Sequence, residues 1–107
     1  MSNISRKHIN WEKTGRNLLI LRNDNLTLRR NVCRALNYDK NECSGLCEDC
    51  RYDIDMNISR AELAKIFNVS DSVIFNWESG KTPVGLEDML FYCAISGVKP
   101  EDIIVFD

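Results

Sequence analysis

The sequence has little of what several classes of protein require. Its longest unbroken apolar run covers only the seven residues from Met89 to Ile95, whereas a membrane-spanning helix needs about 20. The first fourteen residues have no apolar central segment, so they do not resemble a secretory signal. There is one histidine, His8, with no Ser-His-Asp arrangement and no glycine-rich phosphate loop, which speaks against an enzyme. We therefore expect a cytoplasmic, non-enzymatic protein that does not enter a membrane.

The net charge is small, but the charged residues are unevenly distributed along the chain. The net charge is −2, yet residues 1–40 carry nine Lys or Arg against three acidic residues, and residues 41–107 carry five against thirteen. A basic first third suits a polyanionic partner on one face, although ordinary solvated charge gives the same pattern. Charge alone therefore leaves the partner open.

Apolar periodicity and capping residues predict an all-α domain that spans residues 1–107. Asn10, Thr27, Ser59 and Ser70 are each placed to cap a helix, and Glu62 completes a capping box with Ser59. Gly97 is expected to end a helix in the left-handed conformation. After a flexible basic arm at 1–9, we expect helices over about 11–23, 27–36, 59–67, 70–78, 86–96 and 100–105.

The stretch from Asn37 to Asn57 lacks this periodicity. It is rich in Asn, Asp, Ser and Gly and poor in apolar residues, which predicts a loop. A loop of this length is unusual in a compact domain and indicates function, internal cross-linking or disorder.

The strongest motif is ISRAELAKIFNVSDSVIFNWESGKTP, over residues 58–83. Two short helices are joined by a turn of about three residues, and the small Ala64 lies where they would cross. The stretch resembles the Xre/Cro-like helix-turn-helix family, which includes the phage repressors, from FNVS across the turn to WESGK and Pro83. The resemblance implies a repressor-like fold of five helices, or six with an insertion. That insertion, residues 26–57, separates the first helix from the motif at 58–80.

The resemblance also implies a sequence-specific, DNA-binding transcriptional regulator of the repressor type, a homodimer on double-stranded DNA. Asn76 can pair with adenine, Phe75 can contact a thymine methyl group and Ser72 can bond a base or a phosphate. Glu78 is expected to form a structural ion pair with Arg22. The implied DNA-binding residues are Arg60, Ser70, Asp71, Ser72, Phe75, Asn76 and Lys81, and the charge pattern adds Arg29 and Arg30.

An exposed aromatic residue at position 75 and the acidic later two-thirds of the chain also fit a second function. In that alternative the same fold is a protein-interaction module, such as an antitoxin-like partner or a repressor antagonist. A metal- or thiol-responsive regulator is a third interpretation, because four of the five cysteines are close in sequence.

Cys43, Cys47 and Cys50 form a C-x3-C-x2-C cluster, with Cys33 ten residues before it. Four thiolates could hold a zinc ion, and a bound metal would order the long loop. The spacing is not the paired C-x2-C pattern of common zinc sites, so reduced thiols without metal, a thiol or iron–sulfur sensor and a disulfide stay open. Cys93 is expected in the core.

Overall fold

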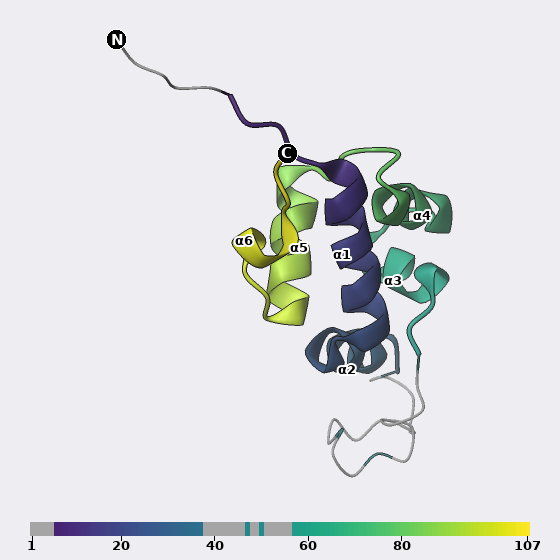
Figure 1. Cartoon of the computed structure of the whole chain (residues 1–107). Helices are drawn as coiled ribbons and strands as arrows, with labels where there is room; N and C mark the ends of the chain where they lie inside the picture. Colours follow the sequence, from purple (N-terminus) through teal and green to yellow (C-terminus); the bar gives the residue numbers. More distant parts are fainter. Residues whose placement is uncertain (1–5, 38–46, 48–49, 51–56) are drawn as a thin grey trace.

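The computed structural model describes residues 6–37, 47, 50 and 57–107 and is built from helices. Figure 1 shows α1 in the middle, with α3 and α4 on one side, α5 and α6 on the other and α2 across one end. The described part contains a single isolated β-bridge and no longer strand, so the predicted all-α fold is confirmed. The helices are α1 (Trp11–Asp24), α2 (Leu26–Asn37), α3 (Arg60–Phe67), α4 (Asp71–Ser79), α5 (Leu86–Ser96) and α6 (Pro100–Ile103).

Asparagine side chains define the ends of the first two helices. The Asn10 side chain accepts a hydrogen bond from the Lys13 backbone and caps α1, as predicted. Asn25 ends α1, and its side-chain oxygen accepts a bond of 2.7 Å from the Leu28 backbone N–H. The predicted cap at Thr27 was therefore wrong, because Asn25 satisfies the first free N–H groups of α2 two residues earlier.

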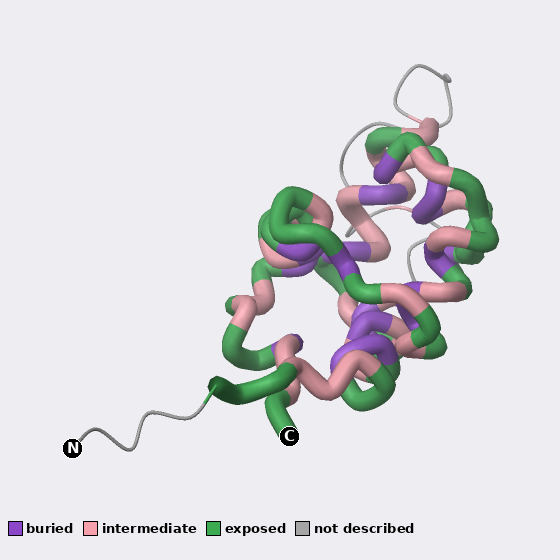
Figure 2. The backbone as a smooth tube through the Cα atoms, turned by 90° about the horizontal axis from the view of Figure 1, so that it is seen from above, coloured by how far each residue is buried: buried purple, intermediate pink, exposed green. Residues whose placement is uncertain are grey.

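The core lies where the helices meet (Figure 2). Phe67, Trp77 and Tyr92 pack as an aromatic cluster with ring centres 4.6 to 6.1 Å apart, a spacing at which aromatic pairs attract each other. The Tyr92 hydroxyl is buried without a hydrogen-bond partner among the described residues. Burial, and then the Glu78 carboxylate, raise the pKa of Tyr92, so this hydroxyl stays protonated.

Gly15 allows α1 to lie directly against α4. A Cβ atom at this position would be 2.3 Å from the backbone oxygen of Trp77, closer than two non-bonded atoms can approach. The missing side chain therefore sets how closely the first helix supports the back of α4.

The helix α2 is an integral part of the core. Leu28 and Val32 are completely buried on its inner face, and α2 contacts α1, α3 and α5. The Asn31 side chain donates a 2.8 Å bond to the Ile95 carbonyl at the end of α5. Because of these contacts, α2 ties the two halves of the helix assembly together.

The two ends of the described chain pair with each other. Ile9 and Phe106 form an antiparallel bridge, Asn10 N–H donates to the Val105 carbonyl and Asp107 N–H donates to the His8 carbonyl. The pairing therefore includes His8 and Ile9, the last two residues of the expected flexible arm. The last helix, α6, is shorter than predicted because the chain turns extended after Ile103 and enters this pairing. No described helix is long and apolar enough to cross a membrane.

Candidate nucleic-acid interface

The first helix of the motif, α3, begins at a complete capping box. The Ser59 hydroxyl accepts from the Glu62 N–H, and the Glu62 carboxylate accepts from the Ser59 N–H, both at 3.1 Å. Leu63 and Ala64 are buried on the inner face of the helix. The predicted cap is therefore confirmed, and it fixes the direction in which α3 leaves the preceding segment.

The turn between α3 and α4 depends on Asn68. This residue ends α3 in the left-handed conformation, with φ of 58°, which asparagine tolerates better than most residues. The following Val69 N–H donates 3.0 Å back to the Ala64 carbonyl, and the Val69 side chain packs against the core. The turn is thus short and held at both ends, so α4 has a defined orientation to α3.

The second helix, α4, has one buried and one exposed face. Ile74, Trp77 and Glu78 are buried. The residues between them fall on the opposite side, as helical periodicity requires. The outer face carries Asp71, Ser72 and Phe75, which are exposed, and Asn76, which is half-buried. Ser70 occupies the N-cap position, but its hydroxyl meets Ser72 at 2.9 Å instead of bonding the helix backbone.

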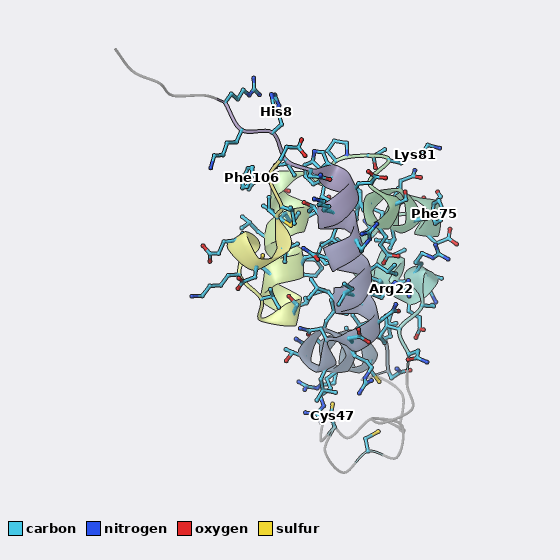
Figure 3. All side chains as sticks on the ribbon, viewed as in Figure 1. His8, Arg22, Cys47, Phe75, Lys81 and Phe106 are labelled. Carbon is cyan, nitrogen blue, oxygen red and sulfur yellow. The ribbon has the colours of Figure 1, made fainter. Side chains whose placement is uncertain are left out.

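A buried ion pair holds α4 against α1. Arg22 donates from Nε and from a terminal nitrogen to the two oxygens of Glu78, at 2.7 and 3.1 Å. Its other terminal nitrogen donates 2.9 Å to the Ile58 carbonyl, just before α3. This arginine therefore links three segments, and the predicted structural role of the pair is confirmed. Figure 3 shows Arg22 between α1 and α3.

The loop after α4 is anchored to the end of that helix. Gly80 ends α4 with φ of 78°, and a single carbonyl, that of Asn76, accepts from the Lys81 and Thr82 N–H groups at 2.9 and 3.3 Å. Lys81 is exposed at the start of this loop. Figure 3 places Lys81 and Phe75 on the same side of the molecule, so a cation flanks the outer face of α4.

An arginine from α3 joins this face. The Arg60 guanidinium carbon lies over the Phe75 ring, 5.0 Å from its centre, within the range of a cation–π contact. A hollow of about 270 Å³ lies beside the pair, lined by Leu19, Arg22, Arg60, Phe75, Glu78 and Ser79. Both residues were predicted to contact DNA, but their contact with each other was not predicted, because they are fifteen positions apart on different helices.

The remaining predicted DNA-binding residues, Arg29 and Arg30, lie elsewhere. Both are half-buried on α2, which lies at the other end of α1 from α4 (Figure 1). The Arg29 Nε is buried with no hydrogen-bond partner among the described residues. If a DNA duplex lies on the outer face of α4, these arginines can contact it only outside the base pairs that α4 contacts.

The predicted metal ligands are only partly within the described residues, since Cys43 lies outside them. Cys33, Cys47 and Cys50 are half-buried, and within the described ranges no three His, Cys, Asp or Glu side chains gather as metal ligands would. The Arg34 Nε donates 3.1 Å to the Cys47 sulfur. The guanidinium places a positive charge where a metal cation would have to bind. Cys93 packs against the core, and burial raises its pKa.

Comparison with known proteins supports the geometry. The model of the helix-turn-helix family matches residues 54–103, from before α3 to the end of α6. The matched residues are similar to the Xre/Cro-like helix-turn-helix family, a family of DNA-binding regulators. No curated protein and no solved structure matches the chain significantly.

Proposed function

We propose that this protein is a sequence-specific transcriptional regulator of the repressor type, which inserts α4 into the major groove of DNA. The observation that carries the proposal is the division of α4 into two faces. Ile74, Trp77 and Glu78 fasten its inner face to the core, which leaves Ser72, Phe75 and the half-buried Asn76 on the outer face. A helix that is held rigidly from behind and carries exposed side chains in front can be presented to base edges.

Each outer side chain has a contact that its chemistry favours. Asn76 can form two hydrogen bonds with adenine, and Ser70 and Ser72 can donate to a base or to phosphate at the helix N-terminus. Lys81 would lie beside the backbone phosphates that flank α4. Asp71 can accept a hydrogen bond from the amino group of cytosine.

The phosphate contacts available near α4 are few, so other cations would have to contribute. Arg29 and Arg30 on α2, together with Arg34, are the candidates. Each phosphate contact adds about −0.9 to the slope of log affinity against log salt concentration on B-DNA. Changing the three arginines to Gln should therefore flatten this slope by about 1 to 3. An unchanged slope would mean that α2 does not contact the duplex.

A homodimer on a two-fold operator would double these contacts. Support comes from α5, where Leu86 and Leu90 are 75% and 50% exposed and lie one helical turn apart, with Phe91 beside them. A second copy of the chain would bury this apolar strip. Sedimentation equilibrium should find a dimer that the double change Leu86→Lys and Leu90→Lys dissociates. A monomeric unaltered chain would contradict the dimer.

The protein-interaction alternative has one observation in its favour. Phe75 exposes half of its surface in the centre of the outer face, and aromatic residues are enriched in protein interfaces. In that case α4 would dock on another protein instead of DNA.

The test is selection of duplexes from a random DNA pool by the purified full chain, with and without a zinc chelator. Enrichment of one motif in both arms would support the regulator, and enrichment lost only with chelator would assign a metal-dependent structure to the cysteine cluster. The matched control is the chain with Asn76→Ala and Ser72→Ala, which should enrich nothing. Failure of the unaltered chain to enrich any motif would contradict the proposal and favour the protein-interaction alternative.

A further inference from the structure

The contact between Arg60 and Phe75 is formed only by the folded chain. Arg60 is the first residue of α3 and Phe75 lies in the middle of α4, and both are exposed. The guanidinium carbon is 5.0 Å from the ring centre. No hydrogen bond or ion pair of the Arg60 side chain is found among the described residues, so its five N–H donors are available to a ligand.

The position of the pair adds little to the stability of the fold. A positive side chain in the first turn of a helix opposes the helix dipole, and Phe75 leaves 50% of its surface in solvent, so its ring contributes less than a fully buried one would. The exposed pair therefore points to a ligand that has both an acceptor edge and an apolar group.

We propose that Arg60 and Phe75 act as one recognition unit for a step in which a C5-methylated pyrimidine precedes guanine. This inference rests on the proposed function, because it concerns the base sequence that the α3–α4 surface recognises. The ligand is the thymine–guanine step, and 5-methylcytosine–guanine meets the same requirement.

The chemistry of the two side chains assigns one base to each. Arginine forms two hydrogen bonds with O6 and N7 of guanine in the major groove, and phenylalanine contacts the thymine methyl group. The cation–π contact holds the guanidinium over the ring. Because the guanidinium carbon lies 5.0 Å from the ring centre and successive base pairs lie 3.4 Å apart along the duplex, the two side chains can face two neighbouring bases instead of one.

The methyl group is the discriminating feature. Thymine and 5-methylcytosine both carry it at C5, whereas cytosine and deoxyuridine do not. Phe75 has no hydrogen-bonding atom, so it cannot distinguish these bases in any other way. The unit therefore predicts that methylation of a cytosine–guanine step placed in the thymine–guanine position increases binding.

The experiment measures affinity by fluorescence anisotropy, with the full chain and the operator selected from a random pool. Single thymines are replaced by deoxyuridine, and single guanines by 7-deazaguanine, which lacks N7. At one thymine–guanine step per half-site, we expect affinity to fall about fourfold for the lost methyl group. When the neighbouring guanine is replaced by 7-deazaguanine, we expect affinity to fall about tenfold.

Two variants test whether the residues act together. In the Phe75→Leu variant, the loss of affinity caused by deoxyuridine should become smaller. The loss of affinity caused by 7-deazaguanine should also become smaller, because the arginine loses its aromatic partner. In Arg60→Lys only the 7-deazaguanine effect should disappear. Lys81→Ala is the matched control and should weaken all duplexes equally, while Arg16→Ala, an exposed cation on α1, should change nothing. Circular dichroism verifies that each variant is folded.

The outcomes separate this inference from the proposed function. A selected operator whose modified bases behave as described supports both. A selected operator with no such thymine–guanine step, or with base effects that survive both variants, overturns the recognition unit but leaves the DNA-binding regulator intact. If the unaltered chain selects no operator, both proposals fail.

Discussion

The two ends of this molecule differ in how their residues are used. At the α3–α4 end, nearly every side chain has a defined partner or lies on one outer face: Ser59 and Glu62 cap α3, and Glu78 binds Arg22. At the α2 end, Arg34 contacts the Cys47 sulfur, and the chain leads into the cysteine cluster. Figure 3 shows Cys47 at the far side of α2 from Phe75 and Lys81. The molecule therefore combines the proposed recognition surface at one end with a separate cysteine-bearing end joined to the same core.

The largest expected effect is the loss of the buried ion pair at the recognition end. Glu78→Ala leaves the Arg22 guanidinium, whose side chain is 11% exposed, without its carboxylate partner. Removal of one partner of a buried pair costs about 3–5 kcal/mol, and urea unfolding should measure a loss of this size. The control is the double change Arg22→Met and Glu78→Leu, which should recover most of the stability. A loss below 1 kcal/mol in Glu78→Ala would show that the pair is not needed to hold α4.

The second effect tests whether the α2 end belongs to the same cooperative core. Leu28 is completely buried, and Leu28→Ala should lower the free energy of unfolding by about 3 kcal/mol. The exposed neighbour Thr27 is the matched control, and Thr27→Ala should have little effect. If Leu28→Ala lowers the free energy of unfolding and two separate unfolding transitions appear, the two ends of the molecule unfold independently.

The third effect separates base recognition from phosphate binding at the recognition end. Asn76→Ala should weaken binding to the selected operator by about 1–3 kcal/mol, and the preference should relax at a single base pair. Lys81→Ala should weaken specific and nonspecific duplexes alike, because a phosphate contact carries no sequence information. Anisotropy titrations with single-base operator variants measure both. Equal loss on all duplexes in Asn76→Ala would place this side chain away from the bases.

The smallest effect is expected at the cysteine end. Cys47→Ser together with Cys50→Ser should change operator affinity by less than about 0.5 kcal/mol, as surface changes away from a site usually do. The same titration with a zinc chelator should give the same affinity. A large loss of operator affinity in both experiments would mean that the cysteine end controls the shape of the recognition end.

Much of the fold was predictable because its signals are local. Asn10 and Ser59 cap their helices as expected, and Gly97 ends α5 in the left-handed conformation. Where prediction failed, two local signals competed. Asn25 and Thr27 can both cap a helix, and only the structure shows that Asn25 ends one helix and begins the next.

The candidate site was predictable only in part. The family resemblance implied Asp71, Ser72, Phe75 and Asn76, and the structure places all four on the outer face of α4. The placement of Arg29 and Arg30 at a distance from α4 did not follow, since the sequence gives no direction for α2. The family resemblance suggested the ion pair between Arg22 and Glu78, and the structure confirmed it.

Local sequence signals are enough to predict where most helices begin and end, which of their faces are apolar and where the helix-turn-helix motif lies. These properties depend on residues within one or two helical turns. The folded chain is needed to show that α2 is part of the core, that the chain ends pair and that Arg60 contacts the Phe75 ring. The reason is physical: such contacts depend on the relative placement of helices, which is set by side-chain packing among residues distant in the sequence.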